Sequence, residues 1–249
     1  QGAMQSFDNE ILYLPTPSPK QVLEKRIAFL LERLEEEKKQ PGNRYFVGRG
    51  IHLSLENIKG FAATLESLFL RTGHIGSQVG QLGNRDIRNC LEIARNVMSS
   101  PYIRVEELLK AYLAKSTVFI DENHVKKALF RGCYDIYPTG LSKYVQNVYC
   151  LTDELQSSPL LALRLLQLLL DTRHSQTDGQ ESFIALDQVL DYLTGMGFER
   201  RAILLNLQEM LSTGLCLAKD PTRKLIADVD LVQLSPSGLQ HYYWGRQDS

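Results

Sequence analysis

The 249-residue sequence contains no long hydrophobic run. A helix that crosses a membrane needs roughly 20 consecutive, mostly apolar residues. The most apolar stretch, residues 160–170, is interrupted by Arg164 and Gln167. The sequence therefore excludes a membrane-spanning helix, and we expect no membrane partner.

Cysteine is scarce and scattered. The four cysteines, Cys90, Cys133, Cys150 and Cys216, form no C-x-x-C pair, and the five histidines stand at none of the spacings typical of zinc sites. We therefore expect reduced thiols, no disulfide framework and no metal in this chain. Such cysteine usage is typical of a cytoplasmic protein, or of a nuclear one in a eukaryote.

Motifs for nucleotide binding and catalysis are absent as well. The sequence has no G-x-x-x-x-G-K-[ST] loop, no G-x-G-x-x-G after a strand, and no Ser/His/Asp set in a catalytic frame. The glycine-spaced residues 73–83 instead predict a helix–loop–helix connection. No motif predicts an independent enzyme, although a small helical enzyme with an unrecognised site stays an alternative.

Neither sign of charge is in excess overall, but the charge is unevenly distributed. Residues 1–150 contain 20 Lys and Arg against 16 Asp and Glu, whereas residues 151–249 contain 8 against 13. The length fits one large domain or two modest ones. We expect the two parts to face different partners or to face each other.

The start of the chain, Gln1-Gly2-Ala3-Met4, resembles the remnant of a cleaved expression tag. We leave residues 1–4 out of the fold prediction. No basic segment followed by an apolar one comes after Met4, so no secretion signal is predicted.

Helical patterns dominate residues 5–135. Ser18 predicts an N-cap with Pro19 at the first helical position, and apolar residues follow at helical spacing. A second helix is predicted from Ser54 to the break at residues 72–73, and Asp121 is predicted to cap a later one. These signals predict a helical first domain.

Another helix of this domain begins after Asn84 or Asp86, either of which can cap it. Its predicted apolar face consists of Ile87, Leu91, Ala94 and Met98. Arg85 and Arg88 lie in or beside its first turn, where cations oppose the positive end of the helix dipole. An anionic partner at this turn would relieve that misfit.

From residue 159 the pattern changes. Residues 160–170 predict a helix that is apolar nearly all round and central to a core. The later elements predicted here are a strand over 182–186, helices over 187–193 and 199–211, strands over 215–218 and 231–234, and one last helical turn over 235–244. Residues 136–158 are a connecting segment, in which an inter-domain helix is predicted over 139–151.

This order of elements resembles a winged-helix domain, and Leu234-Ser235-Pro236-Ser237-Gly238-Leu239 is similar to the closing Leu-Thr-x-x-Gly of such domains. The resemblance covers residues 159–244. It implies that the helix over 199–211 enters the major groove of duplex DNA. It also implies that the loop between the strands over 215–218 and 231–234 contacts phosphate. The implied DNA-binding residues are Arg200, Arg201, Asn206, Gln208, Lys219, Arg223 and Lys224.

The first part carries a second resemblance. Gly83-Asn84-Arg85-Asp86-Ile87-Arg88, followed by residues 89–94, resembles the lid-helix signature of AAA+ ATPases, especially origin-recognition initiators and related prokaryotic NTPases. The nucleotide-sensing arginine of that family maps onto Arg88, with Arg85 beside it. Residues 121–129 are similar to the last lid helix of these initiators, and a winged helix follows the lid in them.

This chain has neither a Walker A lysine nor a recognisable Walker B strand. The resemblance therefore implies the C-terminal portion of a larger ATPase, in which ATP is bound only with a P-loop core that precedes Met4. The sequence thus predicts a mainly α fold: a lid-like helical bundle over 5–135, the connecting segment over 136–158, and an α+β winged-helix domain over 159–249. Duplex DNA and the P-loop domain are the predicted partners.

Several alternatives stay open. The acidic winged helix can instead dock a protein partner or another subunit, including a copy of the same chain. Arg88 can be an ordinary exposed or ion-paired helix arginine. A basic and aromatic set can either bind single strands by charge and stacking or pack between the two domains; it consists of Lys126, Lys127, Arg131, Lys143, Tyr134, Tyr137 and Tyr144.

Overall fold

The computed structural model describes residues 18–37, 45–47, 51–53, 55–71, 75–114, 121–136, 142–150, 158–175 and 182–247. These residues are mostly helical, with a small three-stranded antiparallel sheet, so the prediction of a mainly α chain is confirmed. Within the described ranges, no helix has both the length and the apolar character needed to cross a membrane. The tag-like residues 1–4 lie outside these ranges.

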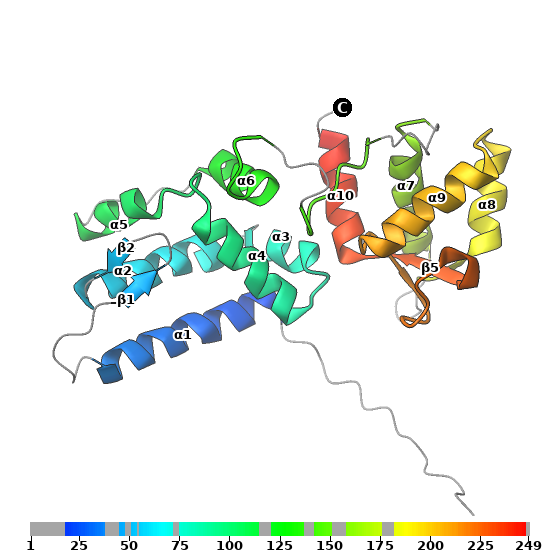
Figure 1. Ribbon diagram of the computed structural model, residues 1–249. Helices are drawn as coiled ribbons and strands as arrows, with labels where there is room; N and C mark the ends of the chain where they lie inside the picture. The colour runs from blue at the N-terminus through cyan, green and yellow to red at the C-terminus, as the bar shows by residue number, and fades with distance from the viewer. Residues whose placement is uncertain are drawn as a thin grey trace, which may run out of the picture.

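The first part of the chain is a group of helices with one short hairpin (Figure 1). Helix α2 continues into a π-helical turn, η1. The elements are α1 (Pro19–Glu37), β1 (Tyr45–Val47), β2 (Ile51–Leu53), α2 (Leu55–Glu66), η1 (Ser67–Arg71), α3 (Ile75–Leu82), α4 (Ile87–Ser99), α5 (Val105–Leu113) and α6 (Glu122–Arg131).

The second part combines helices with the small sheet. Its strands run in the order β3-β5-β4, all pairs antiparallel, with Ile184 opposite Val232 and Cys216 opposite Leu234. The elements are α7 (Leu161–Ser175), β3 (Ile184–Ala185), α8 (Leu186–Gly195), α9 (Arg200–Ser212), β4 (Cys216–Ala218), the 3₁₀ turn η2 (Ile226–Asp228), β5 (Leu231–Leu234) and α10 (Pro236–Gln247).

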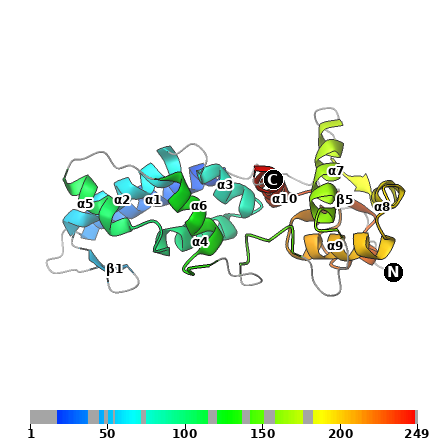
Figure 2. The ribbon, with the colours of Figure 1, turned by 90° about the horizontal axis from the view of Figure 1, so that it is seen from above.

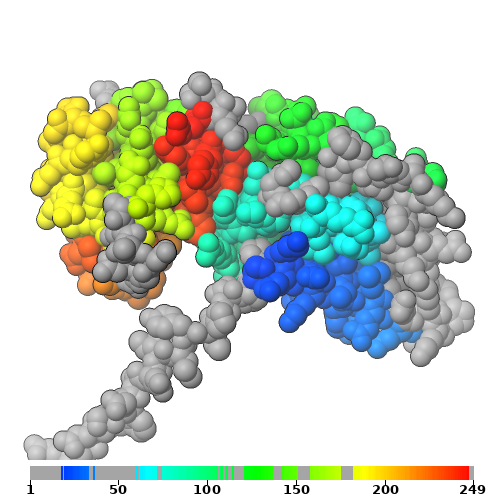
Figure 3. Space-filling model, turned by 180° about the vertical axis from the view of Figure 1, so that it is seen from behind, coloured from blue at the N-terminus to red at the C-terminus, as the bar shows by residue number. Residues whose placement is uncertain are grey.

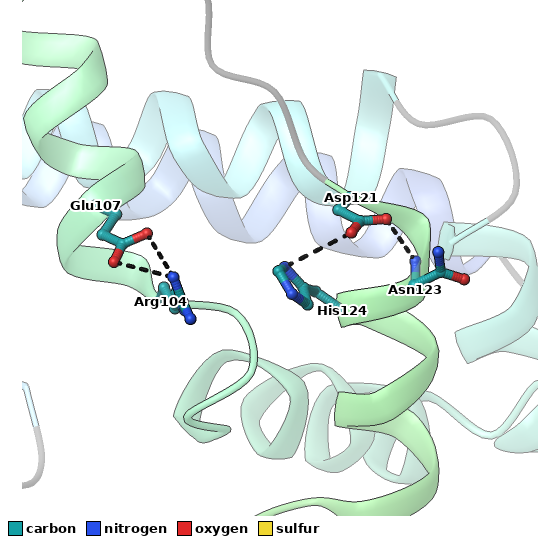
Figure 4. A network of polar contacts seen from close by, with 5 residues as sticks. All are labelled: Arg104, Glu107, Asp121, Asn123 and His124. Atoms are coloured by element: carbon teal, nitrogen blue, oxygen red, sulfur yellow. Dashed lines mark hydrogen bonds and ion pairs between the residues drawn. The ribbon is translucent and has the colours of Figure 1, made fainter.

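The helix starts follow the predicted capping chemistry. Ser18 Oγ accepts from the Gln21 amide at 3.2 Å, and Gln21 Oε1 accepts from the Ser18 amide at 3.0 Å, which is a reciprocal capping box. At α6, Asp121 Oδ1 accepts from the Asn123 amide at 2.9 Å. Figure 4 shows this cap with His124 beside it, its Nδ1 4.0 Å from the second Asp121 oxygen.

The same view shows how α5 begins. Arg104 precedes α5 with a left-handed φ of 47°, and its Nη1 lies 3.3 Å from both carboxylate oxygens of Glu107 (Figure 4). Both side chains are well exposed, so this ion pair contributes little to stability.

Two clusters of buried side chains organise the described residues. One cluster is formed by α7, α8, α9, the sheet and Tyr242 of α10. The other is formed by α1, η1, α3, α4, α6, Ile103, Leu108 and Val145, and it also contains Trp244 of α10. We call them the C-terminal core and the N-terminal core. Helix α10 lies between the two groups of helices in both ribbon views (Figures 1 and 2).

Three local predictions for the first part and the connecting segment are wrong in part or in whole. Of the predicted apolar face of α4, Ala94 is buried and Leu91 and Met98 are partly buried against the N-terminal core, whereas Ile87 is 38% exposed. The fully buried residues of α4 are Cys90, Ile93, Ala94 and Val97. The helix is turned in this way because Cys90 packs inward under the preceding turn, with its thiol 3.6 Å from the Val79 carbonyl oxygen.

The other two errors concern backbone conformation. Gly76 and Gly80 lie inside helix α3, where a Cβ on Gly76 would come within 2.7 Å of the Phe69 carbonyl oxygen. Gly76 therefore permits close packing on η1, and neither glycine marks a loop. Residues 142–150, the described part of the predicted inter-domain helix, are not helical, since the Val145 and Gln146 amides donate to the side chains of Ser142 and His241.

Candidate functional site

The turn between α3 and α4 joins the first part of the molecule to the second. Asn84 and Arg85 both have left-handed backbone conformations, with φ of 50° and 60°. Asparagine tolerates this region better than most residues. Asn84 Nδ2 donates to the Gly214 carbonyl oxygen, and its Oδ1 accepts from the Ser237 amide, both at 2.8 Å. One side chain thus connects the turn to two points of the C-terminal part.

Gly214 ends helix α9 in a Schellman motif. Its φ is 75°, the Gly214 amide donates to the Leu211 carbonyl at 3.3 Å, and the Leu215 amide donates to the Met210 carbonyl at 2.8 Å. Asn84 therefore binds the residue that separates α9 from strand β4.

Ser237 lies in the first turn of α10, where backbone amides have no partner within the helix. Ser235 Oγ accepts from the Gly238 amide at 2.8 Å, and Asn84 Oδ1 satisfies the Ser237 amide. The N-terminus of α10 is thus capped partly by its own chain and partly by a side chain from the α3–α4 turn.

Arg85 and Arg88 are exposed and belong to neither core. Asp86 is the N-cap of α4, and its Oδ1 accepts from the Asn89 amide at 2.8 Å. Within the described chain, neither arginine has an ion pair. Arg85 directly precedes this cap residue, and Arg88 follows it by two positions. Both predicted nucleotide-sensing side chains are therefore free to meet an anion.

On helix α9 the predicted DNA-binding side chains differ in what they contact. Arg201 is exposed and has no ion pair in the part of the chain that the structure describes, whereas Arg200 Nη2 lies 3.9 Å from Asp187 Oδ1. Asn206 Nδ2 donates to the Ala202 carbonyl within the helix at 2.9 Å. Arg201 is therefore the α9 cation best placed to meet another molecule.

Gln208 connects α9 to the loop between strands β4 and β5, residues 219–230. Its Nε2 donates to the Lys224 carbonyl at 3.0 Å, and its Oε1 accepts from the Ile226 amide at 2.7 Å. The amide group thus holds the loop against the helix. A base contact by Gln208 stays a prediction, and it would have to compete with these two bonds.

The loop between β4 and β5 contains charged residues of both signs. Lys219, Arg223 and Lys224 are exposed, as predicted cations of the loop should be, but Arg223 Nε lies 3.3 Å from Asp220 Oδ2. The hydroxyl and the amide of Thr222, and then Arg223, donate to Asp220 and hold the pKa of that carboxyl below its usual range. Lys219 and Lys224 are the loop cations without a carboxylate partner among the described residues.

Arg200 and Arg201 do not form one surface with Arg85 and Arg88. They lie at the start of α9, whereas Asn84 binds beyond the other end of that helix, at Gly214. Thirteen residues of α-helix separate the two ends, which is roughly 20 Å. The arginines at the start of α9 and those of the α3–α4 turn are therefore separate, and α9 links them.

The basic and aromatic set is only partly brought together. Tyr144 Oη donates to Glu92 Oε2 at 2.6 Å, and Lys143 Nζ lies 3.4 Å from the same oxygen and 5.0 Å from the Tyr144 ring centre. The Tyr144 hydroxyl, and then Lys143, lower the pKa of Glu92. Lys126 is paired with Glu122 at 3.4 Å, and Tyr137 lies outside the described residues.

Sequence reasoning missed two residues that join the parts, Asn84 as a long-range partner and His241. His241 is 2% exposed on α10; its Nδ1 donates to the Ser237 carbonyl at 2.7 Å, and its Nε2 accepts from the Gln146 amide at 2.9 Å. Because an amide can only donate, the ring must be neutral with its proton on Nδ1. Burial lowers the pKa of His241, consistent with this state. The available signal was a histidine directly before Tyr242, Tyr243 and Trp244 in the last predicted helical turn.

Among the described residues, no group of three or more His, Cys, Asp or Glu side chains could hold a metal ion. Comparison of the chain with protein-family models, with curated proteins and with solved structures finds no match. The arguments that follow therefore rest on the geometry of this chain.

Proposed function

We propose that the chain is the C-terminal regulatory part of an AAA+-type ATPase. Residues 159–249 are then a winged-helix domain that engages duplex DNA. Residues 5–135 are a lid that responds to ATP through Arg88 and Arg85, with the ATP held by a P-loop core outside this chain. The order of helices α7 to α9 around the antiparallel strands β3, β4 and β5 supports the winged-helix part of this proposal.

The observation that carries the proposal is the double contact of Asn84. The turn that presents Arg85 and Arg88 also binds Gly214 and Ser237, which are the end of α9 and the start of α10. An anion that moved this turn would therefore act directly on both helices. Allosteric coupling requires one element whose position both sites influence, and we propose this turn as that element because its Asn84 bonds to α9 and α10 while Arg85 and Arg88 face solvent.

The DNA-binding part rests on exposed cations. Arg201, Lys219 and Lys224 have no carboxylate partner in the described chain; the first lies on α9, and the second directly follows strand β4. DNA affinity depends strongly on the neutralisation of phosphates. Because residues 151–249 contain more acidic than basic residues, we expect weak binding that decreases steeply with salt.

Duplex binding is tested by fluorescence anisotropy of a labelled duplex over a salt series. Wild-type protein should bind at low salt, and Lys219→Ala with Lys224→Ala should weaken binding and reduce the slope of log K against log salt by about 0.9 for each lost phosphate contact. Arg201→Ala should weaken binding as well. Arg173→Ala, which removes an exposed cation from α7, is the control. Absence of binding at low salt, or equal loss in the control, rejects duplex binding.

The nucleotide part is tested on the protein extended upstream of Met4. We expect a P-loop domain there and an ATPase rate that falls about 100-fold in Arg88→Ala, since removing one charge-stabilising donor typically has an effect of this size. Arg95→Ala, an exposed arginine two turns further along α4, should keep its activity. An upstream sequence without a P-loop rejects the ATPase assignment.

A further inference from the structure

A cavity lies between α4, the end of α6 and residues 142–145. Its volume is about 360 Å³, which is within the range of small-molecule sites. Helices α4 and α6 lie beside each other in both ribbon views (Figures 1 and 2). The apolar part of the wall belongs to the N-terminal core and consists of Leu82, Ile93, Val97, Ala128, Leu129 and Val145. The folded core therefore forms this cavity.

Part of the basic and aromatic set lines the same cavity. Arg131, Lys143, Tyr134 and Tyr144 all contribute to its wall. Glu92 is the one acid among the described lining residues, and it accepts from Tyr144 Oη at 2.6 Å and from Lys143 Nζ at 3.4 Å. Two cations thus stand against one acid, so the charged part of the wall favours an anionic ligand.

The two cations of the wall are able to bind phosphate. Arg131 is half-buried, and its Nη1 donates to the Asp135 carbonyl oxygen at 2.7 Å, which is a neutral group. Within the described residues Arg131 has no carboxylate partner. The Lys143 side chain is 64% exposed although it is paired with Glu92, and an exposed ion pair is weak. Guanidinium and ammonium groups both bind phosphate.

Tyr134 presents an aromatic ring on a fixed backbone. It lines the cavity and is 53% exposed. Its amide donates to the Arg131 carbonyl oxygen at 2.9 Å, and its own carbonyl oxygen accepts from Tyr102 Oη at 2.8 Å. Aromatic side chains that are both exposed and held in place are platforms on which unpaired bases stack.

Asn96 adds a group that can bond to the edge of a base. It is exposed on α4 and lines the cavity, and its side-chain amide makes no hydrogen bond within the described residues. A carboxamide both donates and accepts. The cavity thus offers cations, an aromatic ring and an amide, which match the phosphate, the face and the edge of one nucleotide.

A further cation on α6 indicates that this nucleotide belongs to a strand. Lys127 is exposed and has no ion pair in the part of the chain that the structure describes. It lies four residues before Arg131, so the two side chains lie on the same face of the helix. The phosphate next to one bound at the cavity can therefore meet Lys127. A free nucleotide would leave this cation unused.

The cavity is separate from the cations of the second part. In the space-filling view from behind, the green surface of α6 and the yellow surface of α8 lie on opposite sides of the red surface of α10 (Figure 3). Helix α9 lies with α8 beyond α10 in both ribbon views (Figures 1 and 2). A ligand in the cavity therefore does not need Arg201 of α9.

We propose that this cavity binds one unpaired nucleotide of a single-stranded nucleic acid. The base stacks on Tyr134 and bonds to Asn96, Arg131 and Lys143 bind its phosphate, and Lys127 binds the next phosphate. Stacking and phosphate charge act on every sequence, so binding should tolerate sequence changes. The site goes beyond the proposed function and does not depend on it, because duplex DNA and ATP are assigned to other residues.

Binding is tested by fluorescence anisotropy of a labelled oligo(dT) strand of about 15 nucleotides. Tyr134→Ala should weaken binding about 10-fold, because a stacking partner is lost, whereas Tyr134→Phe should bind like wild type. Tyr192→Ala is the control, since it removes a tyrosine of similar exposure, 55%, from α8. Circular dichroism verifies that each variant folds.

The phosphate contact is tested over a salt series. Lys127→Ala should reduce the slope of log K against log salt by about 0.7, the value for one phosphate of a single strand. Lys110→Ala, which removes an exposed cation of α5 outside the cavity, should keep the wild-type slope. Lys219→Ala with Lys224→Ala should keep the affinity for oligo(dT), so this site and the duplex site can fail independently.

The cysteines locate the bound strand. Cys133 is exposed and lines the cavity, whereas Cys150 is exposed but does not line it. Burial raises the pKa of Cys90 to about 11 and that of Cys216 to about 12, so these thiols should react slowly. Oligo(dT) should slow the alkylation of Cys133 by iodoacetamide but not that of Cys150, as read by mass spectrometry. A blunt duplex should leave Cys133 reactive, because its bases are paired.

Thymidine monophosphate distinguishes a strand from a free nucleotide. It should bind at least about 10-fold more weakly than oligo(dT), because it has no second phosphate for Lys127. Equal affinity for the two ligands overturns the assignment to a strand. Absence of oligo(dT) binding at low salt, an equal loss in Tyr192→Ala, or a strand that leaves Cys133 unprotected overturns the site itself.

Discussion

Asn84 and His241 are two polar side chains that join distant segments of this chain. Asn84 bonds to residues 130 and 153 positions away, and His241 bonds to an amide 95 positions away. Each uses a donor and an acceptor at once. Because hydrogen bonds require alignment, such double contacts fix the orientation of the segments as well as their proximity.

The first prediction concerns Asn84→Gly. Glycine keeps the left-handed backbone without strain, so the substitution removes only the side-chain bonds to Gly214 and Ser237. We expect the free energy of unfolding to fall by about 1–3 kcal/mol, because two hydrogen bonds worth about 0.5–1.5 kcal/mol each are lost. Hydrogen exchange should become faster in the first turn of α10, and urea unfolding measures the loss.

Arg85→Gly is the matched control for this variant. Arg85 occupies the next left-handed position, and its side chain makes no hydrogen bond or ion pair in the part of the chain that the structure describes. It should unfold at the same or a higher urea concentration than wild type. If both variants lost the same stability, the role of Asn84 as a clamp would be contradicted.

The second prediction concerns pH. The pKa of His241 is lowered by burial in the folded protein, whereas in the unfolded chain it should be near 6.5. The unfolded state therefore binds the proton more readily. The stabilisation by neutral His241 is complete above about pH 6.5 and is lost as the pH falls through the lowered folded value.

Protonation of His241 Nε2 would place an N–H group against the N–H of Gln146. The free energy of unfolding should therefore fall by roughly 1–3 kcal/mol. Thermal unfolding at pH 5 and pH 7.5 measures it. His241→Gln should be less stable at pH 7.5 and should depend less on pH than wild type. His174→Gln, at an exposed position on α7, should keep the wild-type dependence. Identical pH profiles for all three proteins would refute the prediction.

Helix α10 is longer than the sequence pattern predicted, because contacts with distant segments stabilise it. The sequence predicted one helical turn over 235–244, whereas α10 runs from Pro236 to Gln247. Its first turn lies so close to the connection between α9 and β4 that a Cβ on Gly238 would be 2.0 Å from the Leu215 carbonyl oxygen. The glycine therefore permits a packing distance that no other residue allows.

The third prediction follows from this distance. Gly238→Ala should lower the free energy of unfolding by roughly 1–3 kcal/mol, because backbone must move to admit the methyl group. Gly195→Ala lies at the end of α8, where a Cβ would have no neighbour within 4 Å, so it should be neutral or slightly stabilising. Urea unfolding of both variants separates the effect of the close contact from that of helix propensity. Equal stability of the two variants would argue against the close approach.

For the whole molecule, α10 contributes to both cores. Tyr242 belongs to the C-terminal core and Trp244 to the N-terminal core, where its ring centre lies 4.6 Å from that of Phe130. Tyr149 also donates its hydroxyl proton to the Gly245 carbonyl. The division into domains over 5–135 and 159–249 stays a prediction, and the last helix provides side chains on both sides of that boundary.

The fourth prediction is that the two cores unfold together. Trp244 is the one tryptophan in the sequence, so its fluorescence reports on α10, whereas far-ultraviolet circular dichroism reports on all helices. The two urea transitions should coincide, as for a two-state protein. Trp244→Ala should lower the free energy of unfolding by about 3–5 kcal/mol. Because it removes the contribution of α10 to the N-terminal core, it should also divide the circular dichroism transition into two. A wild-type protein whose two probes disagree would contradict this coupling.

The sequence by itself determined the mainly helical character, the caps at Ser18 and Asp121, and the positions of β4 and β5. These features depend on residues within a few positions of each other, where capping and hydrophobic periodicity act directly. It also located the exposed arginines of the α3–α4 turn and of α9.

The tertiary structure alone decided that Cys90 is buried and Ile87 exposed on α4, that Gly76 and Gly80 lie within a helix, and that Asn84 and His241 join the two parts of the chain. The physical reason is that each of these features satisfies a hydrogen bond or fills space contributed by a distant segment. The pattern of one segment contains no information about the partner that the folded chain brings to it.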